Sequence, residues 1–256
     1  MFSLESIVLL VVGFIGGFLG SEVGAGAMIT LPALLFLGLP PAAAVATNAL
    51  SAWITNLVAG YEYWRNKRIQ YDIVFHLAPL AFVGSIFGAR LISVINPVQA
   101  SSIIAILFAV VFLILFVVFR KGMPGMKQGS SKYDHTRKIL AGIGAFLLGV
   151  YGGFFAVGVT TLFLALIIGL LRRDFTQAAA DAVAISAIFL LGSLVQFAGG
   201  DLIQYSYAIP LALGCAFGAY YGSRTAMKRG NGWIKGLVMI MVLMVIAKLS
   251  YTAFAK

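Results

Sequence analysis

The chain has 256 residues, of which 61% are hydrophobic and only 10% are charged, and its mean hydropathy is +1.02. Because about a quarter of the residues of a soluble domain are charged, lipid rather than water must cover much of this surface. The net charge of +10 does not indicate a nucleic-acid partner, since the basic residues lie in short loops between apolar runs, where they mark the cytoplasmic side.

The apolar runs follow one another in two similar series. In the first half two short runs precede three longer ones, at residues 6–20, 26–38, 42–64, 72–94 and 100–119. The same rhythm returns in the second half, at residues 139–155, 158–171, 175–198, 205–227 and 233–254. Continuous apolar runs of about 20 residues cross a bilayer as helices, whereas the strands of a β-barrel alternate. We therefore expect an all-α polytopic membrane protein.

Short motifs indicate that the two series are internal repeats. Gly16-Gly17-Phe18 recurs as Gly152-Gly153-Phe154. Ile69-Gln70-Tyr71 recurs as Ile203-Gln204-Tyr205, and the offset of this second pair is 134 residues (203 − 69 = 134). Gly84, Gly88 and Arg90 recur as Gly218, Gly222 and Arg224 at the same offset. Repeats of this size are common in secondary transporters. We assign residues 1–119 to a first transmembrane repeat, 120–138 to a cytoplasmic linker and 139–256 to a second transmembrane repeat.

The basic residues predict that the second repeat is inverted relative to the first. Arg65, Lys67 and Arg68 place the loop after run 42–64 in the cytoplasm, whereas the matching loop at 199–201 has no basic residue. Arg172 and Arg173 precede run 175–198, whereas the matching residues 39–41 are uncharged. This reversal places both chain termini outside.

Each repeat is expected to hold a broken helical hairpin plus three transmembrane helices. The short runs would span only about 20 Å each as helices, so we place a hairpin tip at Ser21–Gly26 and its counterpart between runs 139–155 and 158–171. Two thin, tilted crossings per hairpin would give the same topology and stay open as an alternative.

The interrupted segments Gly20–Gly26 and Ala156–Thr161 are the strongest indication of a substrate site, because broken backbone survives in a membrane only inside protein or beside a wet cavity. Helices that start there present N–H groups and a positive dipole end, which suit an anion. Tight helix packing is the alternative role of the glycines. The predicted substrate-binding residues of the two tips are Ser21, Glu22, Gly24, Gly26, Gly158 and Thr160.

Polar side chains on the next helices complete the predicted site. Thr47, Asn48 and Ser51 lie on the first of them and Asp181 on its counterpart in the second half; polar groups in such helices face the bundle interior. Glu22 and Asp181 are also proton-coupling candidates, because burial in an apolar environment favours a neutral carboxyl group. A structural hydrogen bond to the hairpin backbone is the alternative for Glu22, and a structural partner such as an arginine is the alternative for Asp181.

No pattern in the sequence indicates an enzyme. Cys215 is the only cysteine, His76 and His135 lie far apart, and there is no Walker sequence or zinc spacing. We therefore expect no catalytic residue, no metal and no cofactor, and a small-molecule solute and the lipid bilayer as partners. A channel remains an alternative to a transporter, and whether the chain forms a homo-oligomer stays open.

The order of motifs resembles the TauE/SafE sulfite-exporter-like family. The resemblance rests on Gly16-Gly17-Phe18-Leu19-Gly20 through Gly26, Thr30-Leu31-Pro32, Gly38-Leu39-Pro40-Pro41 and Ala46-Thr47-Asn48, and in the second half on Gly152-Gly153-Phe154-Phe155, Gly158, Ala180-Asp181 and Gly218 to Arg224. It implies a multi-pass permease of the inner (plasma) membrane that moves sulfur-containing or organic anions such as sulfite or sulfonates, without an ATPase of its own.

The sequence also departs from the pattern of that family. Members often carry a lysine at the positions of Ala49 and Ala182, and Gly-Pro-Gly where this chain has Ala156-Val157-Gly158. The missing lysines, together with Glu22 and Asp181, leave a zwitterionic or cationic solute as an alternative to an anion.

Overall fold

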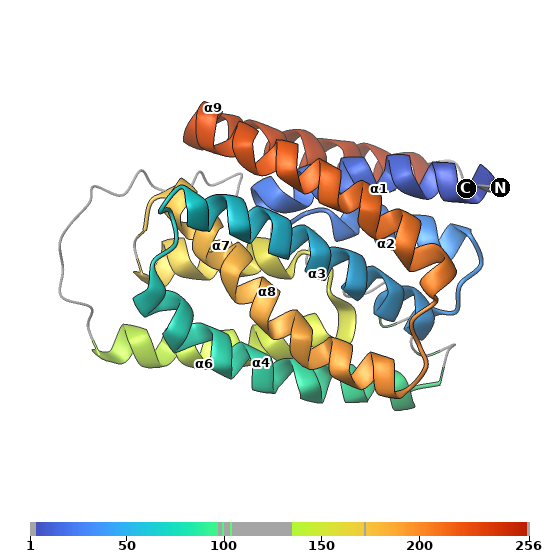
Figure 1. Cartoon of the computed structure of the whole chain (residues 1–256), viewed down its shortest axis with the longest axis horizontal. Coiled ribbons are helices and arrows are strands. Elements are labelled where there is room, and N and C mark those ends of the chain that lie inside the picture. Colours follow the sequence, from blue (N-terminus) through green and yellow to red (C-terminus); the bar gives the residue numbers. More distant parts are fainter. Residues whose placement is uncertain (1–3, 97–98, 100–102, 104–134, 172, 255–256) are drawn as a thin grey trace.

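Helices account for nearly all of the described part of the chain. The structure, a computed structural model, describes residues 4–96, 99, 103, 135–171 and 173–254. Its helices are α1 Leu4–Val23, α2 Ala27–Phe36, α3 Pro41–Arg65, α4 Tyr71–Val94, α6 His135–Phe155, α7 Val159–Leu171, α8 Phe175–Gly199 and α9 Tyr205–Phe254. They run between two ends of one elongated bundle (Figure 1).

Five of these helices, α1, α3, α4, α6 and α8, are long and apolar enough to cross a membrane. Large apolar side chains face outward along them, such as Phe75 (74% exposed) and Leu147 (59% exposed). Water would not tolerate so many of these side chains on one surface, whereas hydrocarbon does. The prediction of an all-α polytopic membrane protein is therefore confirmed.

The two hairpins each combine one long and one short helix. The prediction of two short pieces was wrong for α1 and α6, which have 20 and 21 residues. Residues 21–23 include neither glycine nor proline, so α1 continues through Ser21 and Glu22 and breaks only at Gly24, where φ is +72°. The partner helices α2 and α7 have only 10 and 13 residues, too few to span about 30 Å of hydrocarbon.

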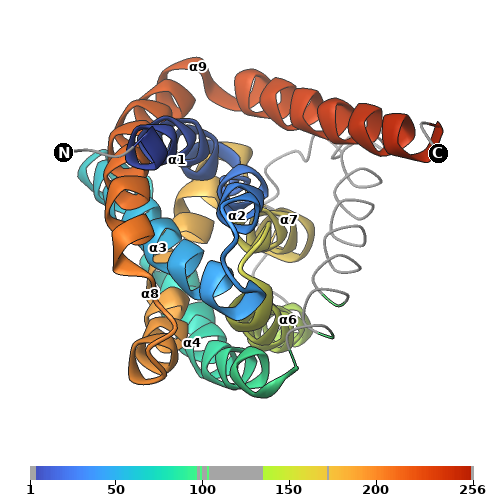
Figure 2. The same ribbon diagram turned by 90° about the vertical axis from the view of Figure 1, so that its right-hand side faces the viewer.

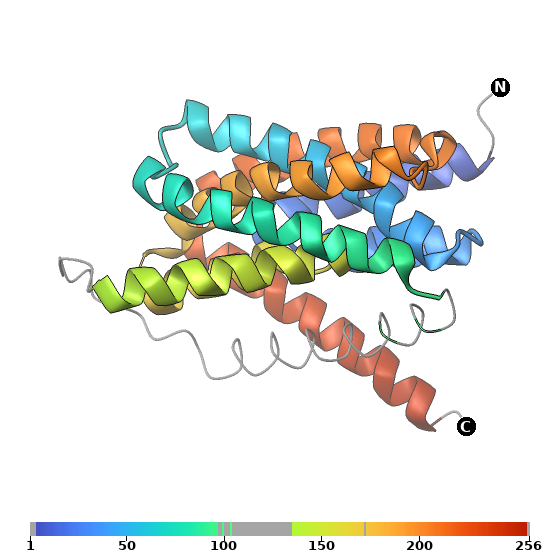
Figure 3. The same ribbon diagram turned by 90° about the horizontal axis from the view of Figure 1, so that it is seen from below.

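The boundaries of several predicted segments also differ from expectation. Residues 135–138, assigned to the linker, form the first turn of α6, and the runs 205–227 and 233–254 belong to one helix, α9, which bends along its length (Figures 2 and 3). The predicted run 100–119 and linker residues 120–134 lie outside the described part, except residue 103.

The helices pack in pairs drawn from opposite halves of the sequence. Helix α1 lies against α9, and α6 lies against α4, as Figures 1 and 2 show. Glycines make this close approach possible, because a Cβ atom would meet the backbone of the partner helix at each contact. These glycines are Gly13 and Gly17 on α1, Gly214 and Gly218 on α9, Gly84 and Gly88 on α4, and Gly149 and Gly153 on α6.

Hydrogen bonds at corresponding positions also join the halves. The Asp181 carboxylate on α8 accepts the backbone N–H of Gln70 at 2.7 Å, before α4 begins. Thr47 on α3, which lies 134 residues before Asp181 (181 − 47 = 134), accepts the backbone N–H of Gln204 at 3.0 Å, before α9 begins. The inverted repeat stays a prediction, and this correspondence supports it.

The turns after α3 and α8 have the same backbone. We call residues 65–69 the basic turn and residues 199–203 the acidic turn. Lys67 and Asp201 hold left-handed φ angles of 54° and 50°. In the first turn the N–H of Arg68 bonds Tyr63 O at 3.0 Å, and in the second that of Leu202 bonds Phe197 O at 3.1 Å, a common helix stop. The basic turn lies at the end of the bundle opposite the start of α1 (Figure 1).

Candidate substrate site

The tips of the two hairpins touch inside the bundle. A Cβ atom placed on Gly24 would lie only 2.5 Å from the Cβ of Thr160 and 2.6 Å from the backbone nitrogen of Thr161. Only glycine therefore fits where the tip after α1 meets the start of α7. The contact brings together the two interrupted segments that the sequence marks as the site.

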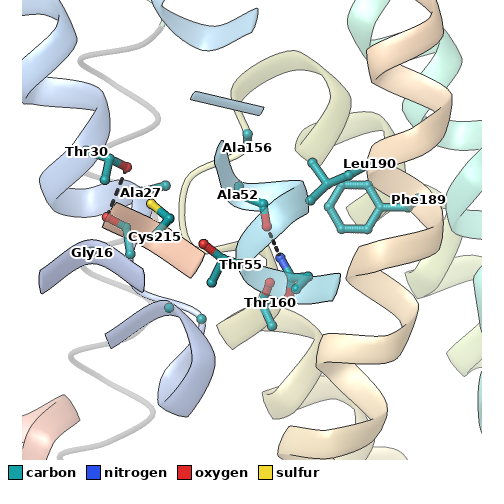
Figure 4. Close-up of a pocket in the computed structure, with 14 residues that line it drawn as sticks. Gly16, Ala27, Thr30, Ala52, Thr55, Ala156, Thr160, Phe189, Leu190 and Cys215 are labelled. Carbon is teal, nitrogen blue, oxygen red and sulfur yellow. Dashed lines mark hydrogen bonds between the residues drawn. The ribbon is translucent and has the colours of Figure 1, made fainter. Parts of the chain in front are cut away.

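A small cavity of about 30 Å³ opens beside this contact, which is room for about two water molecules or a solute of a few heavy atoms. Figure 4 shows Cys215, Thr55 and Thr160 gathered in its middle, between Thr30 and the pair Phe189 and Leu190. Both tips and helices from both halves contribute to the lining, which consists of Gly16, Gly20, Gly24, Gly26, Ala27, Thr30, Ala52, Thr55, Asn56, Ala156, Thr160, Phe189, Leu190 and Cys215.

The lining is polar on one side and apolar on the other. Thr55 and Asn56 of α3 contribute a hydroxyl and an amide group, whereas Phe189 and Leu190, which lie 134 residues further along (189 − 55 = 134), contribute hydrocarbon. Asn56 donates its amide to Ala52 O at 2.8 Å, and its side-chain oxygen is buried without a partner. The cavity therefore holds an unused polar atom but, among its lining residues, no charged side chain.

The start of α2 faces this cavity. Gly26 and Ala27 line the space, and no side chain caps the helix end. The N–H groups of Met28 and Ile29 in this turn already bond Ala25 O and Gly26 O, each at 3.0 Å, so the backbone at Gly26 and Ala27 and the positive end of the helix dipole are what the turn offers to an anion. In an uncharged cavity, this helix end is a feature that attracts negative charge.

Three of the predicted site residues line the cavity: Gly24, Gly26 and Thr160. The Thr160 hydroxyl lies 2.8 Å from the Ser186 hydroxyl. Asn48 does not line the cavity, but its side-chain oxygen accepts the hydroxyl of Thr30 at 2.5 Å, and Thr30 lines the cavity.

The other tip residues have structural contacts outside the lining. Ser21 bonds Phe18 O at 2.9 Å, and Ser51 bonds Thr47 O at 3.4 Å within its own helix. Gly158 supplies a φ of +70° at the start of α7. The two serine hydroxyls therefore have backbone partners, and none of the three residues lines the cavity.

Glu22 is buried (1% exposed) but does not line the cavity. One carboxylate oxygen accepts the indole N–H of Trp233 on α9 at 3.1 Å, and the other oxygen is buried without a partner. The Arg229 guanidinium stacks on Trp233 at 4.0 Å. Glu22 therefore ties the end of α1 to α9 and retains one unused oxygen.

Thr47 and Asp181 also lie outside the lining. Each is fully buried and holds the backbone that precedes a helix of the other half, as described above. Asp181 keeps one oxygen without a partner. Each therefore has a backbone partner in the other half, which accounts for a polar side chain at this position.

Sequence reasoning missed two features. Phe189, Leu190 and Cys215 line the cavity, but apolar residues in an apolar helix carry no signal of a site. Glu62, buried on α3, accepts the guanidinium of Arg224 on α9 at 2.9 Å. A glutamate within an otherwise apolar run is a signal that could have revealed this ion pair.

Comparison with known proteins agrees with this architecture. The family model of the sulfite exporter TauE/SafE matches residues 9–249. A probable membrane transporter protein of Haemophilus influenzae is 29% identical over 245 residues, covering 95% of this chain and 94% of that protein. The probable membrane transporter protein YfcA of Escherichia coli K12 is 28% identical over 250 residues, covering 97% and 91%.

A more distant relative is the probable membrane transporter protein YdhB of Bacillus subtilis, which is 27% identical over 219 residues, covering 85% of this chain and 87% of that protein. No solved structure matches the chain. Because the family model spans nearly the whole chain and the fold supplies membrane-crossing helices, this protein belongs to the sulfite exporter TauE/SafE family and is a multi-pass transporter of the cell membrane.

Proposed function

We propose that the protein is a secondary transporter for a small sulfur-containing or organic anion, such as sulfite or a short sulfonate. The observation that carries this proposal is the uncapped start of α2 at a cavity whose lining residues have no charged side chain. A helix N-terminus favours a negative group, and no lining carboxylate opposes it. The carboxyl groups of Glu22 and Asp181, which would favour a cation, lie outside the lining.

The two-sided lining refines the class of solute. Oxyanion oxygens would meet the Thr160 hydroxyl, the start of α2 and the Thr55 hydroxyl once it turns away from Ser51 O, to which it donates at 3.0 Å. Phe189 and Leu190 favour a solute that also has an apolar part. The small volume of about 30 Å³ favours a solute whose apolar part is short. Methanesulfonate and sulfite are therefore the first two compounds to test.

Transport would proceed by rocking of the two predicted inverted repeats about the cavity. The cavity draws its lining from both halves, so a movement of one half against the other would open it to one side at a time. Glu22, with its unused buried oxygen, is the candidate for proton coupling, and Asp181 is the second.

Binding is tested by the melting temperature of the purified protein in detergent with sulfite, methanesulfonate, acetate or methylamine. Binding to the native state raises this temperature. We expect the anions to raise the melting temperature, and we expect this rise to be lost in the double variant Thr55→Val and Asn56→Leu. The leucine at position 56 is the residue found at the corresponding position 190. Thr225→Val, which changes a half-buried threonine outside the cavity, is the matched control. A rise with methylamine alone would overturn the choice of an anion.

Coupling is tested separately by uptake into proteoliposomes at several pH values. We expect the pH dependence of uptake to disappear in Glu22→Gln, which keeps an acceptor for Trp233. Unchanged pH dependence in both Glu22→Gln and Asp181→Asn would remove proton coupling through these groups. Flux that neither saturates nor shows counterflow would indicate a channel instead of a transporter.

A further inference from the structure

A second, larger hollow lies on the outside of the bundle, at the basic turn. It has a volume of about 560 Å³ and is lined by Trp64, Arg65, Lys67, Ile69 and Tyr71. None of these residues belongs to the lining of the cavity between the hairpin tips. The transport site therefore does not account for this groove.

The groove presents its cations from a fixed backbone. Lys67 N–H bonds Trp64 O at 2.9 Å and Arg68 N–H bonds Tyr63 O at 3.0 Å, which closes the turn. The bond from Gln70 N to the Asp181 carboxylate at 2.7 Å then anchors the end of the turn to α8. A site built on such a turn loses little conformational entropy when it binds a ligand.

Exposed aromatic rings extend from the groove toward the middle of the bundle. Trp64 and Tyr71 are 54% exposed. Tyr61, one turn before Trp64, has its ring centroid 5.9 Å from that of Trp64, and Phe75, one turn after Tyr71, lies 6.4 Å from Tyr71. Aromatic rings of this kind mark the level of the lipid headgroups, and the next turn lies beside acyl chains.

The positive charge of the groove is not cancelled by the nearest acidic groups. Asp72 pairs with Arg173 at 3.7 Å, and Glu62 pairs with Arg224 at 2.9 Å. Within the described residues, Arg65 and Lys67 make no ion pair. Basic pockets at the cytoplasmic ends of transmembrane helices suit anionic headgroups.

We propose that this groove binds an anionic phospholipid, with the phosphate between Arg65 and Lys67 and the acyl chains along Tyr61 and Phe75. The acidic turn provides a comparison within the molecule. It has the same backbone, yet Gly199 stands where Arg65 does, and Asp201 where Lys67 does. The backbone of the turn therefore does not require the two cations, and their role in topology is compatible with binding a lipid phosphate on the same side.

The test measures the melting temperature of the purified full chain in detergent with added phosphatidylglycerol, phosphatidylcholine or glycerol 3-phosphate. We expect phosphatidylglycerol to raise the melting temperature, and the other two to leave it nearly unchanged. The rise should disappear in Arg65→Gln combined with Lys67→Asn, since asparagine also tolerates the left-handed φ at position 67. A normal melting temperature of this variant without lipid shows that it folds.

The matched control is Arg137→Gln combined with Lys138→Gln, which removes the same charge at the same end of the bundle, where Lys138 O lies 3.2 Å from the His76 ring. It should keep the full rise. Equal loss in both double variants would overturn the proposal in favour of nonspecific attraction. A full rise with glycerol 3-phosphate, with phosphatidylcholine, or in the Arg65/Lys67 variant would overturn it as well.

Discussion

The indole N–H of Trp53 donates to the backbone oxygen of Ala187 at 3.1 Å, and these residues lie 134 positions apart. This separation equals the offset between the two predicted repeats, so the bond joins corresponding positions of α3 and α8. Corresponding residues of two related halves can touch only near the axis that relates them. The contact therefore indicates where the two halves meet.

Replacement of Trp53 by phenylalanine should weaken this junction. The change removes one hydrogen bond, which contributes about 1 kcal/mol, and should lower the melting temperature of the purified protein. Trp64→Phe is the control, because Trp64 is 54% exposed and has no such bond across the halves. Equal melting temperatures for the two variants would show that the bond contributes nothing to the stability of the junction.

Gly24→Ala should abolish uptake into proteoliposomes. The new Cβ would lie 2.5 Å from the Cβ of Thr160 and would also occupy a φ of +72°, so the two hairpin tips would have to separate. Gly38→Ala separates these two effects, because Gly38 has a φ of +86° but no atom within 4 Å of a Cβ. If Gly38→Ala loses as much uptake as Gly24→Ala, backbone strain alone explains the loss and the tip contact is unimportant.

Thr47→Val and Asp181→Ala should lower stability without changing solute affinity. Each leaves a backbone N–H without its acceptor, that of Gln204 or of Gln70, at a cost of about 1–3 kcal/mol. Thermal unfolding measures the loss, and the ligand-induced rise in melting temperature measures the affinity. Asp181→Asn retains an oxygen acceptor and should be the mildest of the three. If Thr47→Val loses the ligand-induced rise in melting temperature, Thr47 contributes to solute binding.

The ion pair between Glu62 and Arg224 should respond unequally to loss of either partner. The Glu62 side chain is 4% exposed and that of Arg224 is 40% exposed. Arg224→Met therefore leaves a buried carboxylate without its partner, whereas Glu62→Gln leaves an arginine that can reach water. We expect the larger fall in melting temperature for Arg224→Met and partial recovery in the double variant. Equal, additive losses would contradict a direct pairing.

Cys215 gives a probe of cavity opening in the native chain, because it is the only cysteine and lines the cavity. It is 2% exposed, so a small methanethiosulfonate reagent should react slowly and only when the cavity opens. A solute that occupies the cavity should slow labelling several-fold. If a solute raises the melting temperature but leaves the labelling rate of Cys215 unchanged, that solute binds outside the cavity.

The sequence predicted the class of fold well, and it indicated two of the glycines that line the cavity. Long apolar runs and basic loops were enough to indicate a helical membrane protein. The extent of α1 was misjudged because its apolar run was ended at Gly20 and Ser21–Gly26 was taken as the hairpin tip. Burial and the bond of Glu22 to Trp233 allow the helix to continue through Ser21 and Glu22. That bond joins residues 211 positions apart, and no local pattern reveals such a pairing.

The same limit applies to the cavity. Glycines at Gly24 and Gly26 indicated the tips, because the broken backbone leaves a local signature. Thr47 and Asp181 were assigned to the site because polar groups in membrane helices face inward, but that rule does not distinguish a cavity from a backbone N–H of another helix. Only the arrangement of the helices decides between these two partners.

The pairing of α1 with α9 has a consequence for the order of events during synthesis. Helix α1 leaves the ribosome well before the glycines against which it packs, Gly214 and Gly218. Helix α4, by contrast, meets α6 as soon as the second half begins to emerge. The face of α1 that carries Gly13 and Gly17 must therefore contact lipid or a chaperone until α9 is made, and a nascent chain released before residue 205 would lack the helix against which α1 packs.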